Sequence, residues 1–407
     1  MRVLNLSLDK KILEKDSAVQ RRLVALAEGI VGKAKHHPLA SQTRHSPSTE
    51  GERKRKEIKE GLTVLVPGER DEAKEISAYL TAYSFGGPKW LQLWKMWRKG
   101  EQILSRNPSS DSEVGGLPFT KGELRCDLIT VQDTAYLALI AYLLARRFKI
   151  PLEIQVHGLE KFCGARKWVA GFVLRRADKI RVVSERLKRE LDSRFKIHDS
   201  RIYELSVYTQ MGERGEKGEN GERGEKGAKQ PFTFLTVGRL APVKNIALQI
   251  RAFARVIKES PQARLRIVGD GSLRESLKLQ VESLKLEDKI IFEGRQENLA
   301  QYYEEADAFL LTSDSEGWGL VALEAAAYGL PIIMTDVGLA GEFIRDGENG
   351  LVIPVGDEDA LVVAMKRLIE DADLRARLGA AARSAFGGLP TPAAQIEKQV
   401  EEWRGLR

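Results

Sequence analysis

Short apolar runs alternate along the first half of the chain with segments in which apolar residues recur at helical spacing. The strand-like runs lie at 3–8, 62–66, 127–131, 152–156 and 179–183, and the helical segments lie at 17–31, 134–147 and 185–193. Continuous apolar runs are typical of strands that helices cover on both faces of a parallel sheet. The first half therefore predicts a doubly wound α/β domain.

The same alternation begins again after residue 231. Strands are predicted at 232–238, 264–269, 289–294, 308–313, 331–335 and 351–355, with helices at 246–259, 272–284 and about 319–328. The chain is thus predicted to be α/β, with two Rossmann-like doubly wound parallel-sheet domains. A chain of 407 residues is long enough for two cores.

Two polar segments divide this pattern. Residues 32–60 have almost no large apolar side chains and are predicted to be a surface insertion, with a nucleic-acid-binding arm as the alternative. Glycine occupies every third position of 212–227, as in collagen, but the tract is short and has no proline. We interpret it as a flexible linker rather than a trimerisation element.

The predicted organisation has four parts. They are an N-terminal domain at 1–207, a linker at 208–230, a C-terminal domain at 231–388 and a final helix at 389–407. The final helix is expected to cross back to the first domain, with Trp403 as a packing anchor.

Charge is distributed unevenly between the halves. Residues 1–210 hold 39 basic and 26 acidic side chains, whereas 211–407 hold 26 and 32. The first half therefore favours an anionic partner.

The longest apolar stretch, Ala135–Ala145, is about half of the ~20 residues that a membrane-spanning helix requires. Two cysteines without a CxxC motif fit a reducing compartment. A cytoplasmic protein without a transmembrane helix is expected.

The residues best suited to chemistry lie at 312–338. Glu316 follows a predicted strand, and Glu324 lies eight residues further on, inside the next helix. Gly317 and Gly319 allow a ligand to approach the backbone, and the helix start near Leu320 offers free N–H groups. Carboxylates and backbone donors together suit sugar hydroxyls, although a turn with a surface glutamate would give the same pattern.

A second candidate group is basic. Arg239 directly follows the predicted strand 232–238, and Lys244 precedes the next helix. Two cations beside a helix N-terminus suit a diphosphate, because the helix dipole adds to their charge. Taken in isolation, such a pair could equally be solvated loop cations.

Together these motifs resemble the family 4 glycosyltransferases of the GT-B fold, also called glycosyl transferases group 1. The resemblance covers about 232–386 strongly and rests on the segments "VGRLAPVKN", "LRIVGDG", "IFEG", "TSDSEGWGLVALEAAAYGLPII" and "GENGLVIPVGD". In the first half it is fainter and rests on "LEIQVHGLE" and "RADKIRVVSERLKREL". It implies two Rossmann-like domains that face each other across a cleft.

The resemblance also implies roles for individual residues. Arg239 and Lys244 would bind the diphosphate of a nucleotide-sugar donor, Glu316 the hydroxyls of the transferred sugar, and Glu324 the ribose. Backbone N–H groups from Gly317 to Leu320, with Gly319 between them, would also face the sugar. His157, at the end of the strand 152–156, would contact the sugar from the first domain. His157 and Glu316 are the catalytic candidates.

No metal site and no cofactor are predicted. Many transferases hold a divalent metal on an Asp-x-Asp motif, and this sequence contains Asp357–Glu358–Asp359 and Asp371–Ala372–Asp373. Both triplets lie at predicted helix starts, where N-terminal capping explains them. Arg239 and Lys244 can stabilise the leaving diphosphate in place of a metal. The family's glycine-rich loop after its first strand is missing from 7–22, where Arg21 or Arg22 could substitute.

Half of the six tryptophans lie in the segment 88–100. On a helix Trp90, Trp94 and Trp97 share a stripe beside lysine and arginine, a composition typical of helices at a membrane interface. The segment is therefore a candidate for contact with an anionic membrane surface or with the acceptor. Packing on the core of the first domain is the alternative.

The function expected from these observations is a retaining, metal-independent transfer of a hexose-type sugar. The donor would be a nucleotide diphosphate-sugar, and the acceptor a lipid-linked or glycan molecule of cell-envelope or exopolysaccharide synthesis. Retention is implied by the resemblance alone. No nucleic-acid partner is expected, and a peripheral position on the inner face of the cytoplasmic membrane is the alternative to a purely cytoplasmic one. The alternatives are a sugar-nucleotide epimerase or phosphorylase of the same fold, or a non-catalytic sugar-nucleotide-binding subunit.

Overall fold

A computed structural model describes residues 1–15, 17–32, 61–105, 126–158, 164–197, 199–206 and 231–406. The predicted linker at 208–230, and all but the first residue of the predicted insertion at 32–60, lie outside the described residues. The chain divides into two compact units, one of Met1–Ser206 with Thr391–Arg407 and one of Val207–Pro390.

The first unit is built on an eight-stranded sheet with the order β3-β4-β2-β1-β5-β6-β7-β8. Its elements are β1 (Arg2–Leu6), η1 (Lys10–Leu13), α1 (Ala18–Ile30), β2 (Gly61–Pro67), β3 (Glu72–Ser77), β4 (Leu80–Phe85), α2 (Lys89–Leu104), β5 (Leu128–Val131), α3 (Tyr136–Phe148), β6 (Leu152–Val156), α4 (Gly164–Leu174), β7 (Lys179–Val182), α5 (Glu185–Phe195), η3 (Asp199–Arg201), β8 (Ile202–Glu204) and α12 (Pro392–Arg404). All neighbouring strands are parallel except β3, which pairs antiparallel with β4 at the edge. The predicted parallel sheet is confirmed, and the antiparallel edge strand β3 is an addition that the apolar pattern did not predict.

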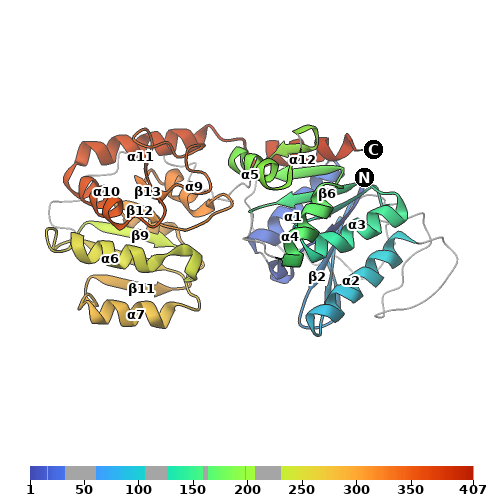
Figure 1. The fold of residues 1–407 in the computed structure, drawn as a ribbon, viewed down its shortest axis with the longest axis horizontal. Helices are drawn as coiled ribbons and strands as arrows, with labels where there is room; N and C mark the ends of the chain where they lie inside the picture. The colour runs from blue at the N-terminus through green and yellow to red at the C-terminus, as the bar shows by residue number, and fades with distance from the viewer. Residues whose placement is uncertain are drawn as a thin grey trace, which may run out of the picture. The chain divides into compact units, whose positions relative to one another are not determined.

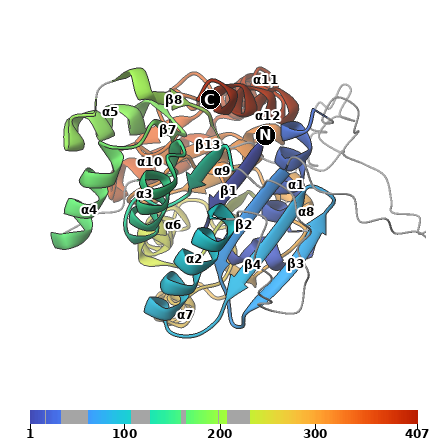
Figure 2. The same cartoon turned by 90° about the vertical axis from the view of Figure 1, so that its right-hand side faces the viewer.

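Helices cover both faces of this sheet. Figure 2 shows α2, α3 and α4 side by side, and α2 packs on α3 as α3 does on α4. On the opposite face, α1 contacts α12. The strands between them are shielded from solvent: every residue of β5 and β6 is buried, including the polar Thr130, Glu153 and Gln155.

The second unit has six parallel strands in the order β11-β10-β9-β12-β13-β14 (Figure 1). Its elements are β9 (Thr233–Val237), η5 (Pro242–Lys244), α6 (Ile246–Val256), β10 (Arg264–Val268), α7 (Arg274–Ser283), β11 (Ile290–Gly294), α8 (Ala300–Glu305), β12 (Ala308–Leu311), α9 (Leu320–Ala327), β13 (Ile332–Thr335), β14 (Leu351–Ile353), α10 (Glu358–Glu370) and α11 (Ala372–Gly387). Helices α6, α7 and α10 share one hydrophobic core with the sheet, around Phe234 and Phe253. The prediction of a second doubly wound domain is confirmed.

Helix α12 is fixed to the first sheet by a buried carboxylate. Glu153 of β6 is fully buried, and its Oε1 accepts a hydrogen bond of 2.8 Å from Nε1 of Trp403. The Tyr203 hydroxyl donates to the same oxygen, and Thr130 and Gln155 donate to Oε2. A buried carboxylate is tolerated only when donors surround it, so Trp403 both fills the core and satisfies Glu153.

A second set of polar contacts holds the same helix from β7. Arg181 donates to Oε1 of Gln399 at 3.1 Å and to the carbonyl of Leu205, while Lys179 pairs with Glu402 at 2.6 Å. Because two successive turns of α12 are bound in this way, the last residues of the chain are an integral part of the first unit.

We expect Trp403→Ala to lower the free energy of unfolding of the first unit by about 3–5 kcal/mol, because it leaves a large cavity and removes a donor from Glu153. Trp403→Phe keeps most of the volume but loses the N–H group, so a smaller loss of about 1–3 kcal/mol is expected. Urea unfolding followed by circular dichroism measures both. The exposed Glu397→Ala on the same helix is the control, and a Trp403→Ala protein as stable as that control would contradict the account.

Candidate functional site

The strand order of the second sheet creates a divergence point between β9 and β12. From β9 the chain continues through α6 to β10 on one side, whereas β12 lies on the other side. Loops that follow such neighbouring parallel strands diverge at their carboxyl ends, and this is where open α/β sheets bind ligands. Arg239 and Lys244 follow β9, and Glu316 follows β12, so three predicted residues lie at this point.

Lys244 and Glu316 are in direct contact. Nζ of Lys244 lies 2.5 Å from Oε1 of Glu316, and both side chains are mostly buried, at 20% and 12% exposed. The Ser313 hydroxyl donates to the same oxygen at 2.6 Å. Arg239 differs: it is exposed, and its side chain makes no hydrogen bond or ion pair within the part of the chain that the structure describes. The site thus combines a paired cation, a carboxylate and a cation that solvent can reach.

Backbone and side-chain contacts hold the two loops together. The Asp314 amide donates to the Val243 carbonyl at 2.8 Å, and the Asn245 side chain donates to Oδ1 of Asp314 at 3.0 Å. Asn245 has a left-handed backbone, with φ of 46°, at the start of α6. Below them the fully buried Gln249 bonds to Thr312 at 2.8 Å. The position of Lys244 relative to Glu316 is therefore set by the loops themselves.

The segment from Gly317 to Leu320 leads into helix α9. Gly319 has φ of 97°, a left-handed conformation that favours glycine, and no side chain caps the helix that begins at Leu320. Gly338, with φ of 56°, allows the loop after β13 to approach: a Cβ there would lie 2.6 Å from the Trp318 carbonyl. The uncapped N–H groups of α9 begin four residues after Glu316 in the chain, so they can bind the same ligand as Glu316.

Glu324 lies further along α9 and is held by an aromatic side chain. The Tyr303 hydroxyl donates to its Oε2 at 2.8 Å, and Tyr303 stacks on Tyr328 with ring centroids 5.2 Å apart. Burial raises the pKa of the Glu324 carboxyl, while the bond from Tyr303 acts in the opposite direction. Burial, and then the neighbouring Glu324 charge, raise the pKa of Tyr303 well above its ordinary value.

In the first unit His157 lies at the carboxyl end of β6, as predicted. Although its ring reaches solvent, the protein atoms crowded around it desolvate the charged form and lower its pKa below the ordinary 6.5. The positive charges of Arg181 and Arg22 act in the same direction. A neutral imidazole can both donate and accept a hydrogen bond, which suits contact with a sugar hydroxyl.

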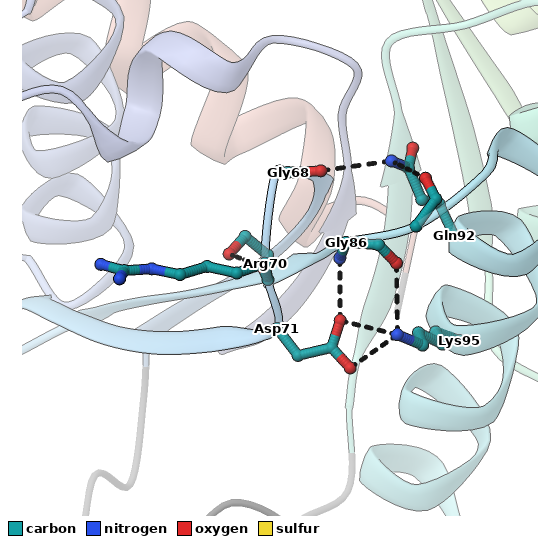
Figure 3. Close-up of polar contacts among 8 residues, drawn as sticks. Gly68, Arg70, Asp71, Gly86, Gln92 and Lys95 are labelled. Atoms are coloured by element: carbon teal, nitrogen blue, oxygen red, sulfur yellow. Dashed lines mark hydrogen bonds and ion pairs between the residues drawn. The ribbon is translucent and has the colours of Figure 1, made fainter.

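The loops after β2 and β4 form a separate polar cluster at the carboxyl edge of the first sheet (Figure 3). Lys95 of α2 reaches both carboxylate oxygens of Asp71, at 2.7 and 2.9 Å, and the Gly86 carbonyl at 3.2 Å. The hydrogen bond from Lys95 lowers the pKa of Asp71, and the Gly86 amide adds to this effect while burial opposes it. Gln92 bonds to the Gly68 carbonyl at 3.2 Å. These contacts fix the start of α2.

The three tryptophans of α2 do not share one environment. Trp90 and Trp94 are 70% and 54% exposed, whereas Trp97 is only partly exposed. The difference arises because the inner face of α2, with Met96 and Gly100, is buried against the domain. The three positions lie on one helix, as predicted, but Trp97 is less exposed than the other two.

Within the described ranges, no group of three or more His, Cys, Asp or Glu side chains could hold a metal ion. The two acidic triplets at 357–359 and 371–373 stand at helix starts. Asp357 accepts the Ala360 amide at 2.9 Å, and Asp371 accepts the Leu374 amide at 2.8 Å. Their predicted role as N-caps is confirmed.

Comparison with known proteins finds a family that matches the second unit. Residues 219–385 match the family model of glycosyl transferases group 1. N-acetyl-alpha-D-glucosaminyl L-malate synthase of Bacillus anthracis is 35% identical over 149 residues, which cover 37% of this chain and 39% of that protein. Poly(glycerol-phosphate) alpha-glucosyltransferase of Bacillus subtilis is 32% identical over 143 residues, 35% of this chain and 21% of that protein.

Solved structures resemble the whole chain. Sucrose-phosphate synthase from Thermosynechococcus elongatus superposes with a TM-score of 0.75 at 19% identity, covering 100% of this chain and 99% of that one. Anabaena Alr3699/HepE in complex with UDP gives a TM-score of 0.69 at 17% identity, covering 100% of both chains.

The chain therefore has the GT-B fold, and residues 219–385, less than half of the chain, match the group 1 glycosyltransferases. This confirms the fold and the family that the sequence motifs indicated. The aligned parts span between 18% and 48% of the length of the curated relatives.

Several residues at the site escaped the sequence analysis. Ser313 and Tyr303, which bind the two glutamates, carry no signal in the sequence, since a serine in a turn and a tyrosine on a short helix are common everywhere. Away from this site, the sequence analysis also missed Trp168 of α4 in the first unit, which is 68% exposed. Its signal was present, because it directly follows Arg166 and Lys167.

The raised pKa of Glu324 has a consequence for stability. The folded protein holds this proton more tightly than the unfolded chain, so the contribution to stability is complete at low pH and is lost as pH rises through the raised pKa. Glutamine cannot ionise, and its amide oxygen still accepts from Tyr303. We expect Glu324→Gln to melt higher than the parent protein at pH 7, with the difference closing as pH falls below the ordinary value of 4.5.

Thermal melts between pH 4 and pH 8 test this prediction. Glu304→Gln, at an exposed position of α8, is the control and should show no such trend. A Glu324→Gln protein whose melting temperature runs parallel to that of the parent at every pH would refute it.

Proposed function

We propose that the protein transfers a hexose-type sugar from a nucleotide diphosphate-sugar to a lipid-linked or glycan acceptor, in cell-envelope or exopolysaccharide synthesis. The diphosphate is bound by Arg239, Lys244 and the N–H groups at the start of α9. Glu316 holds the sugar and Glu324 holds the ribose. His157 contacts the sugar from the first unit.

The observation that carries this proposal is the contact between Nζ of Lys244 and Oε1 of Glu316. In a nucleotide sugar the anomeric carbon is bonded directly to the distal phosphate. A site for such a molecule must therefore place a cation and a hydroxyl-binding carboxylate side by side, and these two side chains meet this requirement. The relatives and fold neighbours include a glucosyltransferase and a complex with UDP, and they support the same donor class.

The proposed reaction proceeds with retention and without a metal ion. The bond between the anomeric carbon and the phosphate oxygen breaks as the acceptor oxygen attacks from the same face. The proton of the acceptor hydroxyl passes to the leaving phosphate. Arg239 and Lys244 stabilise the negative charge that grows on the diphosphate, which is the contribution that a divalent metal makes in other transferases.

Incubation with a nucleotide sugar and an acceptor glycolipid, followed by release of the nucleoside diphosphate, tests the activity. Release only in the presence of the acceptor is expected. Interconversion of the sugar nucleotide without any acceptor would identify an epimerase instead and would overturn the proposal.

Arg239→Ala is expected to weaken binding of UDP or GDP roughly 10- to 100-fold, because one charge-assisted contact to the diphosphate is lost. The Arg239 side chain is exposed and unpaired within the described residues, so its replacement should leave the melting temperature unchanged. Calorimetric titration measures the affinity. Lys258→Ala, at an exposed position just after α6, is the control; equal affinities in the two variants would remove Arg239 from the site.

Chelation tests the proposed independence from metal. Activity is expected to survive excess EDTA within about twofold, since two positively charged side chains take the role that a metal would have. Loss of activity with EDTA and its recovery on addition of Mg²⁺ or Mn²⁺ would contradict this part of the mechanism.

A further inference from the structure

Three helices of the first unit form one continuous outer face (Figure 2). Helices α2 and α3 pack closely, since Gly100 lies directly against Leu144, and Arg147 pairs with Glu101 at 3.1 Å. Helices α3 and α4 are joined by the edge-to-face contact of Tyr142 with Phe172, at 5.3 Å between ring centroids. We call the outward side of these three helices the α2–α4 face.

This face exposes large aromatic side chains from all three helices. Trp90 and Trp94 of α2 are 70% and 54% exposed, Trp168 of α4 is 68% exposed, and Tyr136 of α3 is 48% exposed. Isolated apolar residues on a surface are ordinary, but several exposed aromatic rings on one helical layer mark an interaction surface. The sequence pattern had located only the α2 part of it.

The α2–α4 face is also strongly basic. The three helices contain eight lysines and arginines and one acidic residue, Glu101. Several of these cations lie beside the rings: Arg98 lies 5.6 Å from the ring centroid of Trp94, and Arg146 lies 5.5 Å from that of Tyr142. Lys95 is neutralised by Asp71, whereas Lys89 and Lys167 are exposed and have no ion pair in the described ranges.

We propose that the α2–α4 face docks on an anionic phospholipid bilayer, with Trp90, Trp94 and Trp168 inserted at the level of the headgroups. Tryptophan prefers this depth because its ring is apolar and its N–H is polar, while lysine and arginine extend toward the lipid phosphates. The charge is complementary to an acidic membrane surface. No helix within the described ranges has the length and apolar character to cross a bilayer.

The aromatic residues lie at a defined end of the domain. Trp90, Tyr136 and Trp168 are all in the first two turns of their helices, and each helix starts at the carboxyl edge of the parallel sheet. His157 lies at the same edge, at the end of β6. The next step rests on the proposed transfer. Docking places the carboxyl edge of the first sheet beside the membrane, and the acceptor is an amphiphile embedded in that membrane.

Co-sedimentation with vesicles of phosphatidylcholine, alone or mixed with phosphatidylglycerol, tests the docking. The full chain is expected to bind mixed vesicles at least about tenfold more tightly than neutral ones, and to be released by high salt. Trp168→Ala should weaken binding roughly tenfold, and Lys89→Glu with Lys167→Glu by at least as much. Leu279→Ala and Lys258→Glu, at exposed positions of the second unit, are the matched controls and should change nothing.

Equal binding to both kinds of vesicle, or docking unaffected by Trp168→Ala, would overturn the proposal. So would a homodimer in solution that Trp168→Ala dissociates, because a second copy would then cover the face. Binding of UDP, measured on the same variants, distinguishes a failure of membrane docking from a failure of the proposed sugar transfer. Docking variants are expected to keep the affinity of the parent for UDP, whereas Arg239→Ala is expected to keep its affinity for vesicles.

Discussion

The contact of Lys244 with Glu316 joins two loops that leave neighbouring strands in different directions. It depends on the order of the second sheet, in which β9 and β12 are adjacent although α6, β10, α7, β11 and α8 separate them in the sequence. Asp314, Asn245 and Thr312 then tie the loops at their roots. A lysine and a glutamate that far apart in the chain become a single site because the fold brings the ends of two strands together.

The first unit depends in a similar way on one set of polar contacts, which lies in its core rather than at the edge of its sheet. Glu153 is a charged residue in the middle of a buried strand, where the apolar pattern of β6 alone would not require it. Trp403, Tyr203, Thr130 and Gln155 satisfy it from four other positions of the chain. Through Trp403 this carboxylate makes the last helix part of the first unit.

Much of this architecture could be predicted from sequence because apolar runs and helical spacing record burial directly. Strands such as 152–156 and 179–182 were located almost to the residue, and the aspartates at 357 and 371 were correctly identified as helix caps. The β3–β4 hairpin was missed, because its edge strand has the half-exposed sequence "EAKEIS" and carries no apolar run. Helix α4 was also missed, because its 11 residues are too few to show helical spacing clearly.

The candidate site was predictable to the extent that it lies in local motifs. Arg239, Lys244, Glu316 and Glu324 were proposed from short segments. The side chains that bind the two glutamates were not, since Tyr303 and Ser313 act through contacts that only the folded chain creates. For Trp97 the position on the helix was predictable from sequence, but its exposure was not. A helical stripe indicates which side chains share a side, but only the packing of α2 on the domain decides how far each is exposed.

A crystal structure of the protein with UDP and a hexose tests the central claim most directly. We expect a pyrophosphate oxygen about 3 Å from Nζ of Lys244, with the guanidinium of Arg239 on the same group, and a sugar hydroxyl on Glu316. A nucleotide bound at any other edge of the two sheets, with Lys244 and Glu316 still paired only to each other, would contradict it.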